Sequence, residues 1–262
     1  MMKKIWIFWT SVMFILAAIL FSSCGSKKPQ PSYSDLKYPK REFRGAWIQT
    51  VWQGQYKSMN STQMKHYFVS ILNKMQAAGI NAVIFQVRPQ ADAFYYSELE
   101  PWSSFMTGTQ GKGLPDGFDP LAFMTEECHK RGMELHAWLN PYRVSASENQ
   151  VLMKNHIYYR EPERFVKYGT QIFFDPGIPA NREYICKVVK DIVSRYNVDA
   201  IHMDDYFYPY PIAGKPFPDE RSFARYGAEQ GFDAAHKDDW RRNNVNLSLI
   251  HISEPTRQAE IS

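Results

Sequence analysis

The stretch Ala200-Ile201-His202-Met203-Asp204 has the pattern of a β-strand with one apolar and one polar face. Successive side chains of a strand point to opposite sides, so Ile201 and Met203 share one face and His202 and Asp204 the other. Where helices cover a strand, the apolar face packs against them, because an unpaired polar group is unfavourable in a dry interface. We therefore predict that His202 and Asp204 point into the interior of a barrel of strands.

Three earlier segments show the same pattern, and amphipathic segments alternate with them. The further predicted strands are Gly45–Val51, Ala82–Val87 and Glu134–Asn140. The predicted helices are Thr62–Ala78, Pro120–Lys130 and Pro179–Tyr196. Such alternation is typical of parallel strands joined by crossover helices. The intervals between strands lengthen along the chain, and long loops after strands build the active face of a (β/α)₈ barrel, the α/β fold that we predict.

The phase of the polar residues predicts a shared inner surface. The inward side chains are Trp47 and Gln49, Gln86 and Arg88, and His136, Trp138 and Asn140, with His202 and Asp204 on the last strand. The outward phase holds apolar residues such as Val83, Phe85, Leu135 and Leu139. Each inward residue by itself could be a satisfied buried polar group. Because polar or aromatic residues occupy the inward-facing positions of all four strands, the pattern indicates the floor of an active site.

The N-terminus has the features of an export signal. Lys3 and Lys4 precede an apolar run, and small residues follow it up to Ser23. Leu20-Phe21-Ser22-Ser23-Cys24-Gly25 resembles a bacterial lipobox, in which the cysteine becomes lipidated. We expect a signal in residues 1–23, a polar tether in 24–37 and a lipid anchor to a membrane of the bacterial cell envelope, on the periplasmic or outer-membrane side. The alternative is an ordinary signal cut near Ser23 that leaves Cys24 free.

Several motifs resemble those of the glycosyl-hydrolase-like family 10 lipoproteins. They are Phe43-Arg44-Gly45-Ala46-Trp47, residues 79–89, Leu139-Asn140-Pro141-Tyr142-Arg143, Asp175-Pro176-Gly177 and residues 198–209. The resemblance covers Arg41 to Asn246. It implies a (β/α)₈ barrel hydrolase that acts on glycans, with peptidoglycan strands as a substrate class.

The end of the chain departs from this pattern. Four strands within residues 38–246 account for about the first half of a barrel, which needs at least about 200–250 residues in total. Residues 247–262 read LSLIHISEPTRQAEIS, and we interpret them as a foreign tail that resembles a translated sequencing adapter. Pro255 is expected to break the helix that begins at Asp238.

Glycoside hydrolysis usually needs two carboxyl groups, a proton donor and a nucleophile or base. Asp204 is our candidate for the nucleophile or base, because it lies at the end of the predicted fourth strand and points inward. Asp205 is the alternative for the same role. Alternatively, the two aspartates only anchor the following loop. Arg88 is expected to hold Asp204 ionised or to bind a sugar hydroxyl, with a rim salt bridge as the alternative. Asp92, Glu98 and Glu100 lie on the loop after the second strand, but the resemblance places the partner acid after a later strand.

Flat and polar side chains near these carboxyls are predicted to bind the sugar. The predicted substrate-binding residues are Trp47, Gln86, Arg88, Asp92, His136, Trp138, Asn140, Tyr142, His202, Tyr206 and Tyr208. Any one aromatic residue among them could instead be packing. Four glycines between Gly108 and Gly117 indicate a mobile flap.

Other functional classes find little support. The formal net charge is +4, and two of the 31 basic residues lie in the signal, so nucleic-acid binding is not expected. The sequence has no HxH after the first strand, no HExxH and no G-x-S-x-G, and we expect no metal or other cofactor, although His136 and His202 could share a metal. Cys128 and Cys186 are predicted to be structural thiols on helices. The remaining hypotheses are a glycoside hydrolase and a glycan-binding lipoprotein without catalysis.

Overall fold

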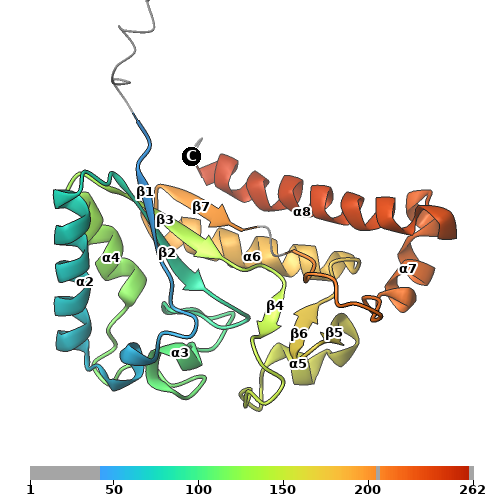
Figure 1. Ribbon diagram of the computed structural model, residues 1–262, viewed down its shortest axis with the longest axis horizontal. Coiled ribbons are helices and arrows are strands. Elements are labelled where there is room, and N and C mark those ends of the chain that lie inside the picture. The colour runs from blue at the N-terminus through green and yellow to red at the C-terminus, as the bar shows by residue number, and fades with distance from the viewer. Residues whose placement is uncertain (1–41, 205–206, 260–262) are drawn as a thin grey trace, which may run out of the picture. The chain divides into compact units, whose positions relative to one another are not determined.

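A parallel sheet of four strands organises the part of the chain that the computed structural model describes, residues 42–204 and 207–259 (Figure 1). Its strands are β1 (Gly45–Ile48), β2 (Ala82–Arg88), β3 (Glu134–Leu139) and β7 (Ala200–Met203), in the order β1-β2-β3-β7. All neighbouring strands pair in parallel. The predicted strands and their order along the chain are confirmed, although β1, β3 and β7 end one to three residues earlier than predicted and β2 ends one residue later.

The predicted signal, Cys24 and the tether lie outside the described residues, as do Asp205 and Tyr206. Within the described ranges, none of the helices combines the length and the apolar character that crossing a membrane would require.

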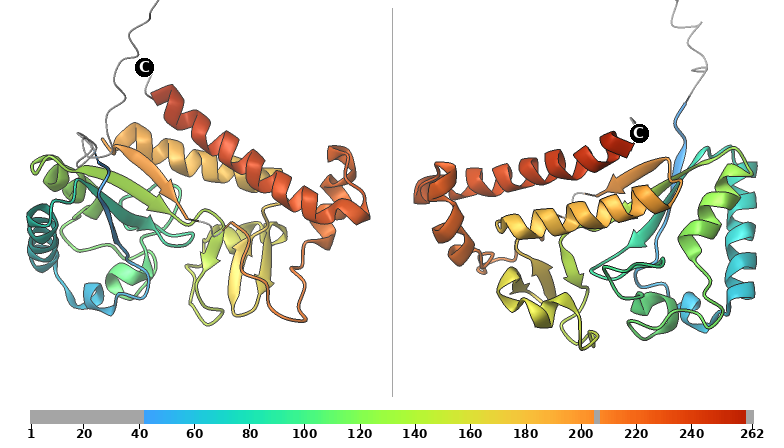
Figure 2. Two further views of the ribbon diagram at one scale, coloured as in Figure 1. Left: turned by 45° about the horizontal axis from the view of Figure 1, so that its top comes forward. Right: turned by 180° about the vertical axis from the view of Figure 1, so that it is seen from behind.

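The three crossover helices form where the sequence predicts them. They are α2 (Ser61–Ala77), α4 (Pro120–His129) and α6 (Pro179–Arg195). Asn60 and Gln63 form a reciprocal capping box at the start of α2, and the Asp119 side chain accepts two backbone N–H bonds at the start of α4. The helices cover the far face of the sheet in Figure 1 and the near face in the rear view of Figure 2.

The main core lies between these helices and the apolar phase of the strands. The fully or nearly fully buried strand residues in it are Ile48, Val83, Phe85, Val87, Leu135, Ala137 and Leu139. Ile201 and Met203 pack against the same cluster, and so does Cys128 of α4. The two-sided pattern of the sequence is therefore confirmed for the side that faces the helices, and Cys128 is a core thiol.

A second sheet, which the sequence analysis treated as loop, follows β3. It is antiparallel and consists of β4 (Arg143–Ser145), β5 (Phe165–Tyr168) and β6 (Gln171–Phe174), in the order β4-β6-β5. Gly169, with φ of 62°, lies in the turn between β5 and β6, where a left-handed conformation suits glycine. Short helices flank these strands and the loops before them: η2 (Gly54–Ser58), α3 (Ser104–Thr107), α5 (Ile157–Arg160) and η3 (Pro162–Arg164).

Four helices follow β7 in the described part of the chain, and the last of them packs on α6. They are α7 (Glu220–Tyr226), η4 (Ala228–Gln230), η5 (Ala234–His236) and α8 (Lys237–Ala259). The α6 and α8 helices lie side by side in both views of Figure 2, and Trp240, Asn244 and Ser248 of α8 are buried. The prediction that Pro255 ends this helix is wrong, because α8 continues to Ala259. A proline removes one backbone donor, and a long helix can accommodate that loss with a local distortion.

The sheet is strongly curved. In a flat sheet, first and fourth strands are about 14 Å apart, three times the spacing between neighbours. Yet the Trp47 indole Nε1 of β1 donates to Nε2 of His202 on β7 across 3.3 Å. Two side chains of this size bridge such a gap only if the strands curl toward one another on the open face. The four strands thus form a section of barrel wall, with helices outside.

Candidate active site

The open face of the sheet gathers aromatic and imidazole rings. The rings of Trp47 and Trp138 both meet the His202 ring edge to face, with centroids 6.0 and 6.1 Å apart. His136 stacks on Phe43 and its Nε2 lies 2.9 Å from a Glu134 carboxyl oxygen. Trp47 is 60% exposed. The structure therefore brings together four of the residues that the inward phase predicted: Trp47, His136, Trp138 and His202.

Protonation of His202 can be assigned from its neighbour. An indole N–H can only donate, so the Nε2 atom that faces Trp47 must accept, and the imidazole proton resides on Nδ1. Partial burial lowers the pKa of His202, with the charge of His136 adding to the effect and Asp204 opposing it. His202 is thus a neutral ring at pH 7.

A chain of amide hydrogen bonds crosses the carboxyl ends of the strands and ends at Asp204. The backbone N–H groups of Thr50 and Val51 donate to Gln86 Oε1 at 2.9 and 3.0 Å. Gln86 Nε2 donates to Asn140 Oδ1 at 2.9 Å, and Asn140 Nδ2 donates to Asp204 Oδ2 at 2.5 Å. We call this chain, Thr50/Val51–Gln86–Asn140–Asp204, the amide relay.

The direction of the amide relay is fixed by its first members. Backbone N–H groups cannot accept, so Gln86 must present its oxygen to them and its NH₂ group to Asn140. Asn140 must then present its own NH₂ group to the carboxyl of Asp204. Gln86 and Asn140 are each 1% exposed, whereas Asp204 is half-buried. The relay therefore orients one partly accessible carboxylate with donors that carry no charge.

Arg88 does not lie where the sequence predicts it. The pairing of β2 with β3 shifts register between Gln86 and Arg88, and Arg88 is aligned with the core residue Leu139. Such a bulge redirects a side chain to the other face of the sheet. Arg88 is fully buried and makes a bidentate pair with Glu100, at 2.7 Å from Nε and 2.6 Å from Nη2. The alternative of a salt bridge is confirmed, but it is buried and not at the rim, and Arg88 is not available to a sugar.

Two carboxyls on the loop after β2, those of Glu100 and Asp92, are also engaged in buried contacts within the protein. Glu100 accepts a bond from the Tyr184 hydroxyl of α6 in addition to its pair with Arg88. Asp92 is fully buried and accepts from the side-chain amides of Gln90 and Gln110 at 2.7 and 3.1 Å. Burial raises the pKa of Asp92. Asp92 therefore holds the loop together, while Glu98 is exposed on its surface.

The predicted aromatic platforms divide into two groups. Trp47 and Trp138 lie on the open face, and the buried Nε1 of Trp138 has no hydrogen-bond partner among the described residues. Tyr142 is fully buried in a second apolar cluster, and its hydroxyl contacts Ser248 Oγ at 2.5 Å. Tyr208 packs on Phe217, and burial raises its pKa. The expectation that Tyr142 contacts sugar is wrong, since its ring serves packing.

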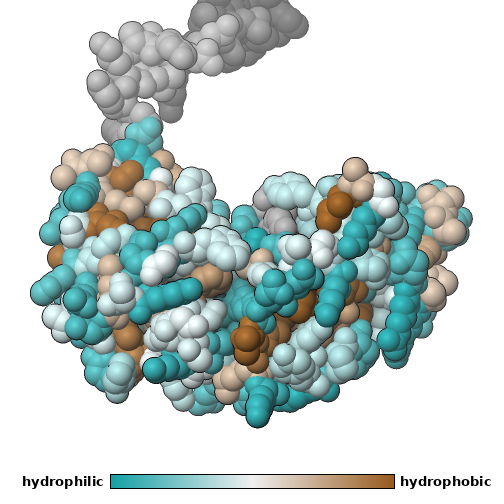
Figure 3. Space-filling model, turned by 60° about the horizontal axis from the view of Figure 1, so that its bottom comes forward, coloured by the Kyte–Doolittle hydropathy of each residue, from teal (hydrophilic) through white to brown (hydrophobic). Residues whose placement is uncertain are grey.

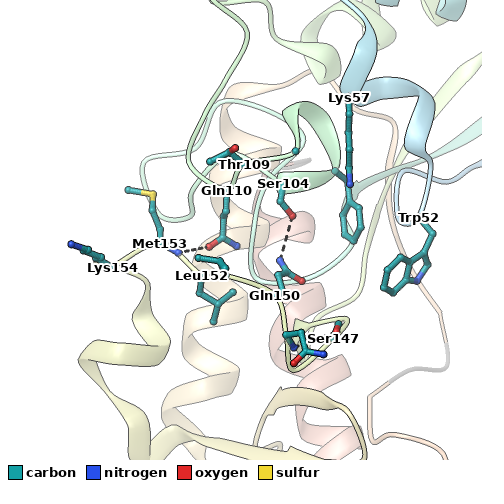
Figure 4. Close-up of a pocket in the computed structure, with 14 residues that line it drawn as sticks. Trp52, Lys57, Ser104, Thr109, Gln110, Ser147, Gln150, Leu152, Met153 and Lys154 are labelled. Atoms are coloured by element: carbon teal, nitrogen blue, oxygen red, sulfur yellow. Dashed lines mark hydrogen bonds between the residues drawn. The ribbon is translucent and has the colours of Figure 1, made fainter.

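A groove that the sequence analysis missed lies among the loops after β1, β2 and β4 (Figure 4). Its volume is about 690 Å³, and its walls include Trp52, Lys57, Gln110 and Lys154. Part of the predicted flap, Gly108 to Gln110, forms one wall, and the Gly111 N–H bonds to the Trp102 carbonyl at 2.8 Å. An isolated tryptophan in a polar loop carries no periodic signal, so only the three-dimensional arrangement reveals the groove.

Metal-ligating side chains do not gather in the described part of the chain, where no group of three or more His, Cys, Asp or Glu residues could hold an ion.

The curved parallel sheet, the helices outside it and the polar and aromatic cluster inside define an α/β protein of the (β/α)₈ barrel class. Among solved structures, the chain resembles α-L-fucosidase isoenzyme 2 from Paenibacillus thiaminolyticus, with a TM-score of 0.54 and 14% identity over 82% of this chain and 30% of the fucosidase. That likeness concerns the fold. The described strands form part of the wall of such a barrel.

The chain belongs to the glycosyl hydrolase-like 10 family, whose model matches residues 42–259. It is 42% identical over 226 residues to glycosyl hydrolase YngK of Bacillus subtilis, covering 84% of this chain and 43% of the relative. It is 33% identical over 270 residues to glycosyl hydrolase DigH of Escherichia coli K12, covering 92% of this chain and 60% of the relative. The chain thus spans about half the length of the curated relatives it matches.

Proposed function

We propose that the protein is a glycoside hydrolase in which Asp204 is the nucleophile or general base. The observation that carries this proposal is the amide relay, in which two buried side chains, Gln86 and Asn140, orient the half-buried carboxylate of Asp204. A carboxylate held in this way offers negative charge to an oxocarbenium-like transition state.

The surrounding rings supply the other parts of a sugar site. Trp47 and Trp138 present flat apolar surfaces on which a sugar ring can stack, and His202 in its neutral form offers an Nδ1–H donor. The proton donor that glycoside hydrolysis needs is proposed to come from outside the described residues, since Asp92 and Glu100 are committed to the loop after β2.

The finer proposals concern substrate and location. We propose a cell-envelope or extracellular polysaccharide as substrate, with peptidoglycan glycan strands as the first to test, and lipidation of Cys24 as the membrane anchor. Two acyl chains hold a protein on a membrane stably, whereas one does so only marginally. Cys24→Ser should therefore move the protein from the detergent-extracted fraction to the soluble fraction. A variant that stays in the membrane fraction would refute lipid anchoring through Cys24.

The hydrolase proposal is tested with Asp204→Asn. The substitution keeps the size and most hydrogen bonds of the side chain but removes its charge, so the rate should fall by on the order of a thousandfold, while binding changes little. Release of reducing ends from peptide-free peptidoglycan strands is measured for the chain alone and for residues 43–246 grafted into the Bacillus subtilis relative. Glu183→Gln, an exposed carboxylate of α6, is the matched control.

Two outcomes would contradict the assignment. Full activity in Asp204→Asn with an inactive Asp205→Asn variant would move the role to the neighbouring residue. If the protein binds the glycan strands but neither the variants nor the parent chain hydrolyses them, a glycan-binding lipoprotein would be favoured.

A further inference from the structure

The groove of Figure 4 is built at the same end of the fold as Asp204. Trp52 and Lys57 come from the segment after β1, Gln110 from the loop after β2, and Gln150 and Lys154 from the segment after β4. Its volume of about 690 Å³ lies within the range of small-molecule sites, about 300–1,000 Å³. Figure 3, which brings the lower end of Figure 1 forward, shows a largely hydrophilic face with separate apolar patches.

The walls of the groove are tied to one another by polar contacts. The Met153 N–H donates to Gln110 Oε1 at 2.8 Å, and Gln150 Nε2 donates to Ser104 Oγ at 3.4 Å. These bonds connect the loop after β2 with the segment after β4 and are drawn in Figure 4. The groove is therefore formed by linked loops, with amide and hydroxyl groups along it.

Trp52 is held in the groove in an unusual way. It is 66% exposed and has φ of 59°, the left-handed conformation, which is unfavourable for a non-glycine residue. Its indole meets the Phe105 ring edge to face at 5.7 Å, so one face of the ring remains available. Folding thus tolerates a strained backbone and a solvent-facing indole at one position, which is the arrangement of a stacking platform.

The same turn connects Trp52 to the candidate carboxylate. Val51, the preceding residue, donates its backbone N–H to Gln86 and so anchors the amide relay that ends at Asp204. The platform and the relay therefore share one rigid turn after β1.

The charge of the groove selects the ligand. Its lining includes Lys57 and Lys154 but no aspartate or glutamate. Both lysines are exposed, and neither makes an ion pair with another residue that the structure describes. Two lysines beside an aromatic platform and several amides suit a polymer that combines sugar rings with carboxylates.

We propose that this groove is a distal subsite for a glycan chain that carries carboxylates, with Trp52 stacking on a sugar ring and Lys57 and Lys154 pairing with carboxylates. The proposal rests on the proposed function and adds to it a binding site outside the amide relay, with the residues that would hold the glycan chain. Gln110 and Gln150 would hydrogen-bond sugar hydroxyls along the chain.

The test compares two glycans that differ in charge. Peptide-free peptidoglycan strands carry a lactyl carboxylate on alternate sugars, whereas chitin oligosaccharides of equal length are neutral. Dissociation constants for both are measured by calorimetry with the 262-residue chain. Lys57→Gln combined with Lys154→Gln should weaken binding of the carboxylated strands three- to tenfold at low salt and leave chitin binding unchanged. The difference should disappear at 0.5 M salt, because the lysines are exposed and screened.

Trp52→Gly separates binding from folding. Glycine adopts φ of 59° without strain, so this variant should unfold at a temperature no lower than the parent chain, yet bind both glycans at least tenfold more weakly. Lys190→Gln, an exposed lysine of α6 far along the chain from the groove, is the control for a general charge effect.

Each outcome decides a part of the proposal. Unchanged affinity in Trp52→Gly overturns the platform, and equal effects of the lysine substitutions on charged and neutral strands overturn the selection for carboxylates. Asp204→Asn should bind as the parent chain does, so loss of hydrolysis with intact binding, or the reverse, distinguishes failure of the catalytic assignment from failure of the subsite.

Discussion

At the end of β2, Arg88 and Glu100 are both buried and matched by a bidentate ion pair, whereas at the end of β7 the carboxylate of Asp204 is half-buried and held by a neutral amide. Both strands belong to one sheet and both ends carry charge. The Nη1 group of Arg88 donates to the carbonyls of Asn140 and Pro141, at 2.7 and 3.0 Å. The charges at β2 therefore secure the loops around the edge, while the carboxylate at β7 is partly accessible to solvent.

Structural and functional carboxylates at one edge of a sheet differ in the groups that hold them. A buried carboxylate that has a matched guanidinium is neutralised and cannot approach a substrate. A carboxylate oriented by an uncharged donor keeps its charge at the surface, where a developing positive charge can use it. Glu100 is therefore structural, because its ion pair with Arg88 is buried, and the partly accessible Asp204 stays our candidate for chemistry.

The largest expected effect comes from breaking the pair at β2. Arg88→Met leaves the Glu100 carboxylate buried without its partner, which should lower the free energy of unfolding by about 3–5 kcal/mol. For a domain of this size the melting temperature should fall by roughly 6–20 °C. Asp204→Asn should change stability by less than about 1 kcal/mol, because its side chain is half-exposed. Thermal and urea unfolding of the two variants measure the contrast directly.

A double variant controls this experiment. Arg88→Met with Glu100→Leu removes both charges, and it should regain at least half of the lost stability, since an apolar pair of similar volume replaces a buried ion pair at little cost. If Arg88→Met alone lowers stability by less than about 1 kcal/mol, the structural role of the β2 end is refuted.

The side-chain directions at the end of β7 could be predicted from the sequence, whereas those at the end of β2 could not. Alternation along β3 and β7 placed Trp138, Asn140, His202 and Asp204 on one face, because a regular strand has a strict period of two. The same rule failed at Arg88, since a bulge adds one residue and reverses the phase. A bulge depends on pairing with the neighbouring strand, and no local pattern reports it.

Two further features depended on contacts that a linear pattern does not contain. The β5–β6 hairpin was missed, although Phe165–Tyr168 and Gln171–Phe174 flank a turn at Gly169, because this segment was interpreted as an active-site loop. Trp52 was missed because neither its backbone conformation nor its neighbours in the groove follow from its sequence position.

Asp175 is a buried carboxyl of another kind, which forms no ion pair with the residues that the structure describes. Asp175 is 3% exposed, and burial raises its pKa to about 6, with hydrogen bonds from Ser222 and the Gly177 N–H opposing the shift. Between a pKa near 4 in the unfolded chain and about 6 in the folded chain, the folded state retains a proton that the unfolded state has released. Stability attributable to this group therefore falls as pH rises from about 4 to 6.

Asp175→Asn should remove that slope. Two pKa units correspond to about 3 kcal/mol, so the variant should exceed the parent chain in stability by up to about 3 kcal/mol at pH 7 and match it below pH 4. Urea unfolding at a series of pH values gives the difference curve. A variant that is equally stable, or less stable, at pH 7 would show that the carboxyl is paired as Glu100 is, and the distinction between matched and unmatched buried carboxyls would not hold.

The smallest expected effect tests the β7 end through its supporting residues. Asn140→Ala removes the donor to Asp204 and leaves Gln86 Nε2 buried without its acceptor, which should lower stability by about 1–2 kcal/mol. The rate of glycan hydrolysis should fall about tenfold, since Asp204 keeps its charge but loses its fixed orientation. If the amide relay acts as one unit, adding Gln86→Ala to Asn140→Ala should lower the rate little further, although Gln86→Ala alone should lower it several-fold. Rates that fall by the product of the two single effects would mean that Gln86 and Asn140 act independently, and Asp204 would then need another explanation for its orientation.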